Sequence, residues 1–176
     1  MNIFILNTGR CGSSTFIKAC SHIKNYSAAH ESRATLVGKQ RLTYPMQHIE
    51  ADNRLSWFLG RLDQKYADNA LYIHLSRNKQ QTIDSFSKRA DFGIMRAYKE
   101  GILLGGENSQ SGEQIAEDYI DTVESNIEFF IKDKSNKMNF SLDNAKQDFE
   151  VFWKFISAEG DLQAALSEWD ISYNAS

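Results

Sequence analysis

Short apolar runs alternate with amphipathic stretches along this chain, a pattern that predicts strands and helices in turn. The runs at 3–6 and 71–75 are uninterrupted, which is typical of strands buried on both faces of a parallel sheet. Weaker strand candidates lie at 25–29, 47–51 and 137–142. The pattern therefore predicts a sheet built from these segments.

Helices are expected between the strands, where apolar residues recur every three or four positions. They are expected at 15–23, at 55–66 after a cap at Asp52 or Asn53, from about Lys79, at 115–127, at 149–156 and at 162–169. Residues 88–111 mix basic, aromatic and glycine residues, and we expect short helices and a mobile loop there. Strands that alternate with helices predict a three-layer α/β fold with a mostly parallel sheet.

The composition fits one domain over residues 1–176, with 41% hydrophobic and 24% charged residues. A net charge of -3 argues against a general nucleic-acid binder, which needs a basic surface. No run approaches the ~20 apolar residues of a membrane span, and no signal peptide is expected before the first strand. Cys11 and Cys20 form neither a metal nor a disulfide pattern, so we expect a reducing cytoplasm.

The first apolar run leads into a turn, NTGRCGSST at 7–15, that has the composition of an anion site. In a strand, turn and helix, backbone N–H groups converge and the helix N-terminus adds positive partial charge. The nucleotide-hydrolase loop G-x-x-x-x-G-K-[ST] is not matched, because Asn7 replaces the first glycine and Ser13 the lysine when Gly12 is the second glycine. A cation is present instead at Arg10. The alternative interpretation is a plain strand-to-helix turn with a Ser/Thr cap.

This rearranged loop resembles the 5′-phosphosulfate loop of sulfotransferases that use 3′-phosphoadenosine 5′-phosphosulfate (PAPS) on a P-loop-like fold. That loop has a lysine or arginine, any residue, a glycine and two small hydroxyl residues. The matching residues are Arg10, Cys11, Gly12, Ser13 and Ser14, and Thr15 follows with a further hydroxyl. The resemblance implies that these residues bind the 5′ end of PAPS.

The family's second signature is an arginine after a later strand and a serine eight residues on, matched here by Arg77 and Ser85. The resemblance implies that the pair holds the 3′-phosphate of PAPS. Arg77 would leave the carboxyl end of a strand, where ligands bind in open α/β sheets, and its guanidinium can grip a phosphate bidentately. Taken alone, Arg77 would be interpreted as a surface arginine and Ser85 as a serine within a helix.

One departure concerns a basic Arg-Lys-Gly segment near the C-terminus, which some cytosolic members use for the 3′-phosphate and which this chain lacks. The nearest basic cluster, at 132–137, is typical of a solvated helix end. Arg89 and Arg96 are other candidates for this grip.

The implied reaction is sulfuryl transfer from PAPS to a hydroxyl or amine, with 3′-phosphoadenosine 5′-phosphate (PAP) as product and no metal. Arg10 would face the bridging oxygen and act electrostatically, since arginine stays protonated. Some carbohydrate sulfotransferases carry a glutamate at about the place of Glu31, and His30 is adjacent. On an extended segment the two side chains point opposite ways, so only one is expected to face the site, and we favour Glu31 as the base. The alternatives are a buried, hydrogen-bonded His30 and a Glu31 that pairs with Arg33.

The acceptor, a small molecule or a carbohydrate, is expected under residues 88–111. Basic and aromatic residues there suit a sugar or an aromatic hydroxyl, although a solvated basic helix face would have the same composition. His74 lies within an expected strand and is predicted to be a core residue. Two rival functions stay open: a small-molecule kinase or other nucleotide-binding protein, and an inactive PAP-binding module.

Overall fold

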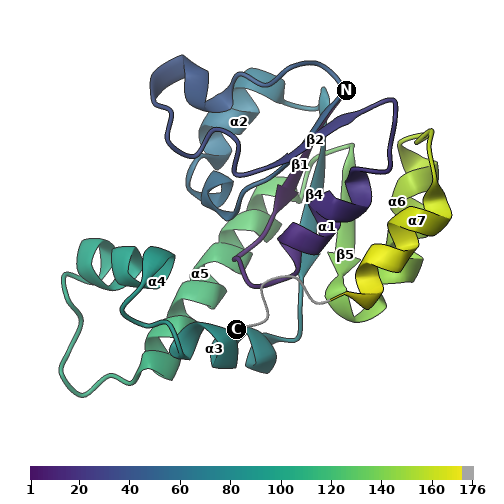
Figure 1. Cartoon of the computed structure of the whole chain (residues 1–176). Helices are drawn as coiled ribbons and strands as arrows, with labels where there is room; N and C mark the ends of the chain where they lie inside the picture. The colour runs from purple at the N-terminus through teal and green to yellow at the C-terminus, as the bar shows by residue number, and fades with distance from the viewer. Residues whose placement is uncertain (172–176) are drawn as a thin grey trace.

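The computed structural model describes residues 1–171 and contains a five-stranded sheet between two layers of helices (Figure 1). The spatial order of the strands is β2 (Ser27–His30), β3 (His48–Ala51), β1 (Asn2–Leu6), β4 (Ala70–Ser76) and β5 (Lys137–Ser141). Every neighbouring pair in this order is parallel. The expected α/β fold with a mostly parallel sheet is confirmed, and each strand lies within two residues of its expected place.

Two helical layers cover the sheet. One face packs against α1 (Ser13–Cys20), α6 (Ala145–Phe155) and α7 (Leu162–Ser167). The other packs against α2 (Leu59–Tyr66), α3 (Lys79–Ser87), the short α4 (Gly93–Ala97) and the long α5 (Gly112–Ile131). Within the described residues, no helix is long and apolar enough to cross a membrane.

The first strand shows why an uninterrupted apolar run is needed here. Ile3 and Ile5 belong to the core on the side of α1 and α6, whereas Phe4 and Leu6 belong to the core on the side of α2 and α5. All four side chains have no exposed surface. Because both faces are covered, a polar residue at any of these positions would be buried without water.

The strand order places a crevice at the carboxyl end of β1. The chain leaves β1 through α1 to reach β2 on one side, and it later reaches β4 on the other side of β1. Such a switch of direction is where open α/β sheets bind ligands. The loop after β1 and the loop after β4 therefore meet at this crevice.

One helix differs from expectation at its start, whereas the segment 88–111 contains short helical turns and a loop as expected. Helix α1 begins at Ser13 rather than at residue 15, because Gly12 with φ 86° takes the N-cap position in a left-handed conformation. The segment 88–111 contains α4, a π-helical turn at Tyr98–Ile102 and an exposed loop. Figure 1 shows α4 and this loop extending away from the sheet.

Candidate active site

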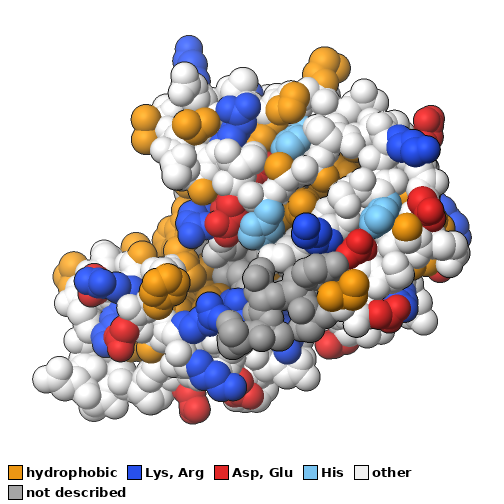
Figure 2. All heavy atoms as spheres, in the orientation of Figure 1, with side chains coloured by type: hydrophobic (Ala, Val, Ile, Leu, Met, Phe, Trp, Pro, Cys, Tyr) orange, Lys and Arg blue, Asp and Glu red, His pale blue; other side chains and the backbone are white. Residues whose placement is uncertain are grey.

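A cavity of about 690 Å³ opens at the carboxyl ends of β1 and β4. Its floor includes Gly9, Arg10 and residues 12–15 from the loop and helix α1. Its walls come from the ends of β2 and β3, from Arg77 after β4, and from the segment that joins α3 to α4. Figure 2 shows the hollow beside the α4 region, with hydrophobic side chains along its inner wall.

The loop after β1 is held in a concave shape by three left-handed residues. Gly9, Arg10 and Gly12 have φ values of 90°, 60° and 86°. The side chain of Asn7 accepts the N–H of Gly9 at 2.8 Å, so the residue that replaces the first glycine of the nucleotide-hydrolase loop braces this turn. From the α5 side, the Tyr119 hydroxyl donates to the carbonyl of Thr8 at 2.7 Å. Backbone N–H groups converge in such a turn and can bind an anion.

Three arginines converge beside the loop. Nε of Arg10 donates to Oγ of Ser85 at 2.9 Å, and Nη1 of Arg77 donates to the carbonyl of Arg10 at 3.3 Å. Arg89 also lines the cavity. Burial, followed by the charges of Arg89 and Arg77, lowers the pKa of Arg10. Cations held this close together repel one another, and a bound anion would reduce that repulsion.

Arg77 and Ser85, the two signature residues after β4, therefore both lie beside Arg10 in the loop after β1. They were expected to hold a phosphate together, but here only Arg77 faces the cavity. Arg77 lines the cavity, whereas Ser85 is not part of the lining and instead accepts from Arg10. Of the other arginine candidates, Arg89 lines the cavity. Arg96 does not, because it points away and pairs with Glu100 on the surface at 2.9 Å.

The Cys11 side chain lies in the core and not in the lining of the cavity. It is buried with 1% exposed surface and hydrogen-bonds to Thr8 Oγ1 at 3.1 Å and to the Gly9 carbonyl at 3.2 Å. Burial raises the pKa of this thiol to about 11, so the sulfur stays protonated at neutral pH. Cys11 therefore offers the cavity no side chain, and only its backbone remains available to a ligand.

His30 and Glu31 both line the cavity, so the expectation that only one would face it was wrong. Strand β2 ends at His30, and Glu31 has a left-handed φ of 52° that breaks the alternation of an extended chain. Nε2 of His30 lies 3.0 Å from Oγ of Ser13, and His30 is exposed rather than buried. Glu31 pairs through Oε2 with Nη1 of Arg54 at 2.9 Å, not with Arg33.

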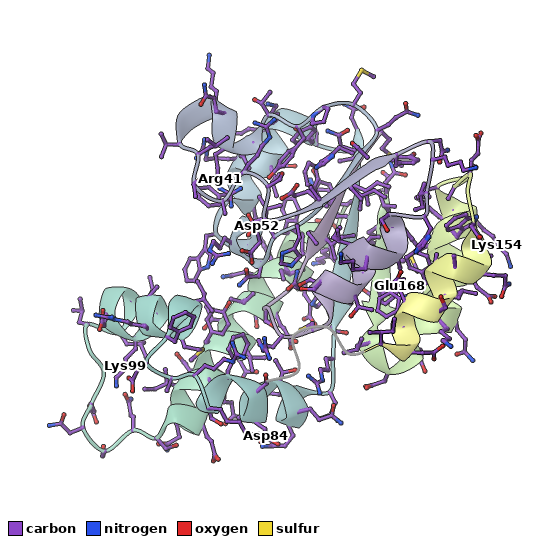
Figure 3. All side chains as sticks on the ribbon, viewed as in Figure 1. Arg41, Asp52, Asp84, Lys99, Lys154 and Glu168 are labelled. Atoms are coloured by element: carbon purple, nitrogen blue, oxygen red, sulfur yellow. The ribbon has the colours of Figure 1, made fainter. Side chains whose placement is uncertain are left out.

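A chain of charged groups connects Glu31 to the buried Asp52 and Arg41. Arg54 lies 3.8 Å from Asp52, whose other oxygen pairs with Arg41 at 2.6 Å. Asp52 has no exposed surface and Arg41 has 2%. Figure 3 shows the labelled Arg41 and Asp52 near each other. Asp52 was expected only as a possible helix cap, and neither Arg41 nor Arg54 was expected near the site, although an acid directly after strand β3 was a visible signal.

Glu50 fixes the turn that follows Glu31. This carboxylate is fully buried in β3 and accepts the N–H and hydroxyl of Ser32 at 2.7 and 2.6 Å. Nε2 of His48 lies 2.9 Å from the same carboxylate. A buried charge is tolerated only with such partners, so this cluster holds the end of β2 against β3. A glutamate between Ile49 and Ala51 in an expected strand was the signal for it.

The opposite wall is apolar. Phe86, Phe92, Ile94 and Met95 come from α3, α4 and the segment between them. Phe92 has 73% of its surface exposed, which marks the outer edge of this wall. Tyr98, one of the aromatic residues of the segment 88–111 expected to cover the acceptor, is buried instead and donates to Asp118 at 2.6 Å.

Comparison with known proteins tests the resemblance. No protein-family model matches the sequence, and neither does any curated protein. A solved structure does match: the sulfotransferase domain from the curacin biosynthetic pathway superposes with a TM-score of 0.65 over 97% of this chain and 78% of that chain. The chain shares its fold with a sulfotransferase domain. The two sequences are 14% identical, so the likeness shows the fold alone.

Proposed function

We propose that this protein is a sulfotransferase that moves a sulfuryl group from PAPS to a hydroxyl or amine of an acceptor. The observation that carries the proposal is the convergence of Arg10 and Arg77 on a left-handed loop at the carboxyl ends of β1 and β4. The shared fold with a sulfotransferase domain supports it.

The residues of the cavity fit a nucleotide with two separate anionic ends. Helix geometry directs the N–H groups of the first turn of α1 toward the loop, where they favour a phosphate or sulfate group. Arg77 and Arg89 supply further guanidinium groups in the same cavity for a second phosphate. A hydrolase of ATP or GTP would need a lysine where Ser13 stands, and that lysine is missing.

Arg10 is assigned an electrostatic role. During transfer, negative charge grows on the leaving 5′-phosphate, and a guanidinium aimed at that oxygen stabilises it. Arg10 is partly buried, which strengthens its interaction with an anion relative to water. In the free protein Ser85 holds the Arg10 side chain, so Arg10 would exchange this partner for the ligand.

Glu31 is assigned the role of base toward the acceptor. Oε2 is held by Arg54, while Oε1 accepts no hydrogen bond from the described residues and can take a proton. The pairing fixes the carboxylate in the cavity, which a general base requires. His30 is the other candidate, with Nε2 already in contact with Ser13. The acceptor, a small molecule or a carbohydrate, would lie between Glu31 and the apolar wall.

Thermal unfolding with nucleotides tests this function. PAP with EDTA should stabilise the protein, by about 2.7 kcal/mol at a hundredfold excess over Kd, or roughly 5–10 °C for a chain of this size. ATP or GTP with Mg²⁺ should do much less. Preferential stabilisation by ATP with Mg²⁺ would instead indicate a kinase. Stabilisation by PAP without transfer from labelled PAPS to any of a panel of phenols and sugars would indicate an inactive binding module.

A further inference from the structure

Glu31 faces the cavity because its backbone leaves the extended conformation. Strand β2 ends at His30, and Glu31 follows with a left-handed φ of 52°, so that both side chains line the cavity. An extended residue 31 would direct its carboxylate to the face opposite His30. The left-handed region disfavours a residue that carries a side chain by about 5- to 30-fold. Other contacts must therefore hold residue 31 in this conformation.

The ion pair with Arg54 does not supply that hold. The side chains of Glu31 and Arg54 are 35% and 39% exposed, and an ion pair this open to water contributes little. The pair also joins the tips of two long side chains, so it orients the carboxylate without fixing φ at residue 31.

Hydrogen bonds on both sides of Glu31 hold the backbone instead. The N–H of Glu31 donates to the carbonyl of Ala51 at 2.9 Å, which continues the pairing of β2 with β3. Beyond it, Ser32 donates its N–H and its hydroxyl to the Glu50 carboxylate at 2.7 and 2.6 Å. Glu50 has no exposed surface, and hydrogen bonds to a buried charged acceptor are strong. The bonds from Ser32 can therefore offset the cost of the left-handed residue.

Glu50 is anchored from the amino end of the same two strands. Nε2 of His48 lies 2.9 Å from Oε2 of Glu50, and Nδ1 of His48 lies 2.8 Å from Oγ of Ser27. The Tyr44 ring stacks on this imidazole, with 5.4 Å between the ring centroids. The Glu50 carboxylate is thus fixed in place, and Ser32 is held to a fixed point.

We propose that Glu50 is a positioning residue for the base: by holding Ser32, it keeps residue 31 left-handed and the Glu31 carboxylate in the cavity. The inference rests on the proposed function, in which Glu31 takes the proton of the acceptor. Glu50 is not part of the cavity lining, so it acts through Ser32 and not on the substrate.

Variants of Ser32 test this role without removing a buried charge. Ser32→Ala removes one charged hydrogen bond and should lower turnover about tenfold, with PAP affinity unchanged. Ser32→Thr retains the hydroxyl and should keep turnover. Ser27→Ala is the matched control, because it removes a hydroxyl from the same cluster at the opposite end of β2, and it should leave turnover unchanged. Full turnover in Ser32→Ala, or an equal loss in Ser27→Ala, would overturn the proposal.

A double-mutant cycle shows whether the effect passes through Glu31. In the Glu31→Gln background, Ser32→Ala should cause no further loss of turnover, since the base is already absent. The same loss in that background as in the unmodified protein would show that Ser32 acts elsewhere.

Nuclear magnetic resonance of the free protein separates this inference from the proposed function. The backbone ¹³C chemical shifts of residue 31 depend on φ and ψ, and they should move toward extended values in Ser32→Ala but not in Ser27→Ala. If the unmodified protein transfers no sulfuryl group, the proposed function fails, and these shifts still decide whether Glu50 and Ser32 hold residue 31. Unchanged shifts in Ser32→Ala would overturn the positioning role even in an active enzyme.

Discussion

Replacing Gly12 by alanine tests the shape of the loop that carries the proposed donor site. Gly12 has a φ of 86°, and the left-handed region costs an alanine about 1–2 kcal/mol. A Cβ at this position would lie 2.7 Å from Cδ1 of Leu142, so the leucine has to move, and overpacking of this kind costs about 1–3 kcal/mol. Gly12→Ala should therefore lower the free energy of unfolding by about 2–5 kcal/mol.

Urea unfolding of Gly12→Ala, read from the midpoint and the slope, measures this loss. The matched control is Gly60→Ala in α2, where an added Cβ meets no atom within 4 Å and φ is not positive. That change should be neutral or stabilising by up to about 1 kcal/mol. A Gly12→Ala protein as stable as the control would show that the backbone is not left-handed at Gly12. The loop would then lack the concave shape that the proposed anion site requires.

A double-mutant cycle with Leu142→Ala separates the two contributions. Removing the leucine removes the clash, so the coupling between the two changes measures overpacking alone. The cost of Gly12→Ala that remains in the Leu142→Ala background should be about 1–2 kcal/mol, the backbone contribution. Complete recovery in that background would show that the clash accounts for the whole effect and that the backbone is not strained.

Three further changes test the proposed roles in binding and transfer. Arg77→Ala should weaken PAP binding at least about tenfold in calorimetry while hardly affecting an analogue without the 3′-phosphate; equal losses for both ligands would remove Arg77 from that role. Arg10→Ala should lower the turnover number more than the affinity for PAP, because the charge it stabilises is greatest in the transition state; turnover preserved at saturation would make Arg10 a binding residue only. Glu31→Gln should keep PAP affinity and reduce turnover about 10²–10⁴-fold, with a smaller loss for His30→Ala; the reverse ranking would make His30 the base.

Strands β1 and β4 could be predicted because each is marked by apolar residues at consecutive positions in the sequence. The uninterrupted run of β1 reflects burial on both faces, and the apolar stripe of α5 reflects one buried side. The glycine and hydroxyl composition of the loop after β1 likewise marked a turn there as a candidate anion site. Each of these features depends on neighbouring residues, which a sequence displays directly.

The missed features depend on contacts across the fold. Arg10 and Ser85 are 75 residues apart, and no local pattern joins them. Arg41 reaches Asp52 only because a short 3₁₀ turn, Gly38–Leu42, folds back toward the end of β3. The error at Glu31 has the same origin, because a left-handed backbone at a non-glycine residue leaves no trace in the order of apolar and polar positions.

A crystal structure of the protein with PAP would show whether the cavity binds the nucleotide and in which direction. We expect the 5′-phosphate against the first turn of α1 and Arg10, the 3′-phosphate against Arg77, and open space beside Glu31 for an acceptor. A nucleotide bound in the opposite direction would contradict this expectation, as would a cavity that stays empty of PAP at saturating concentration.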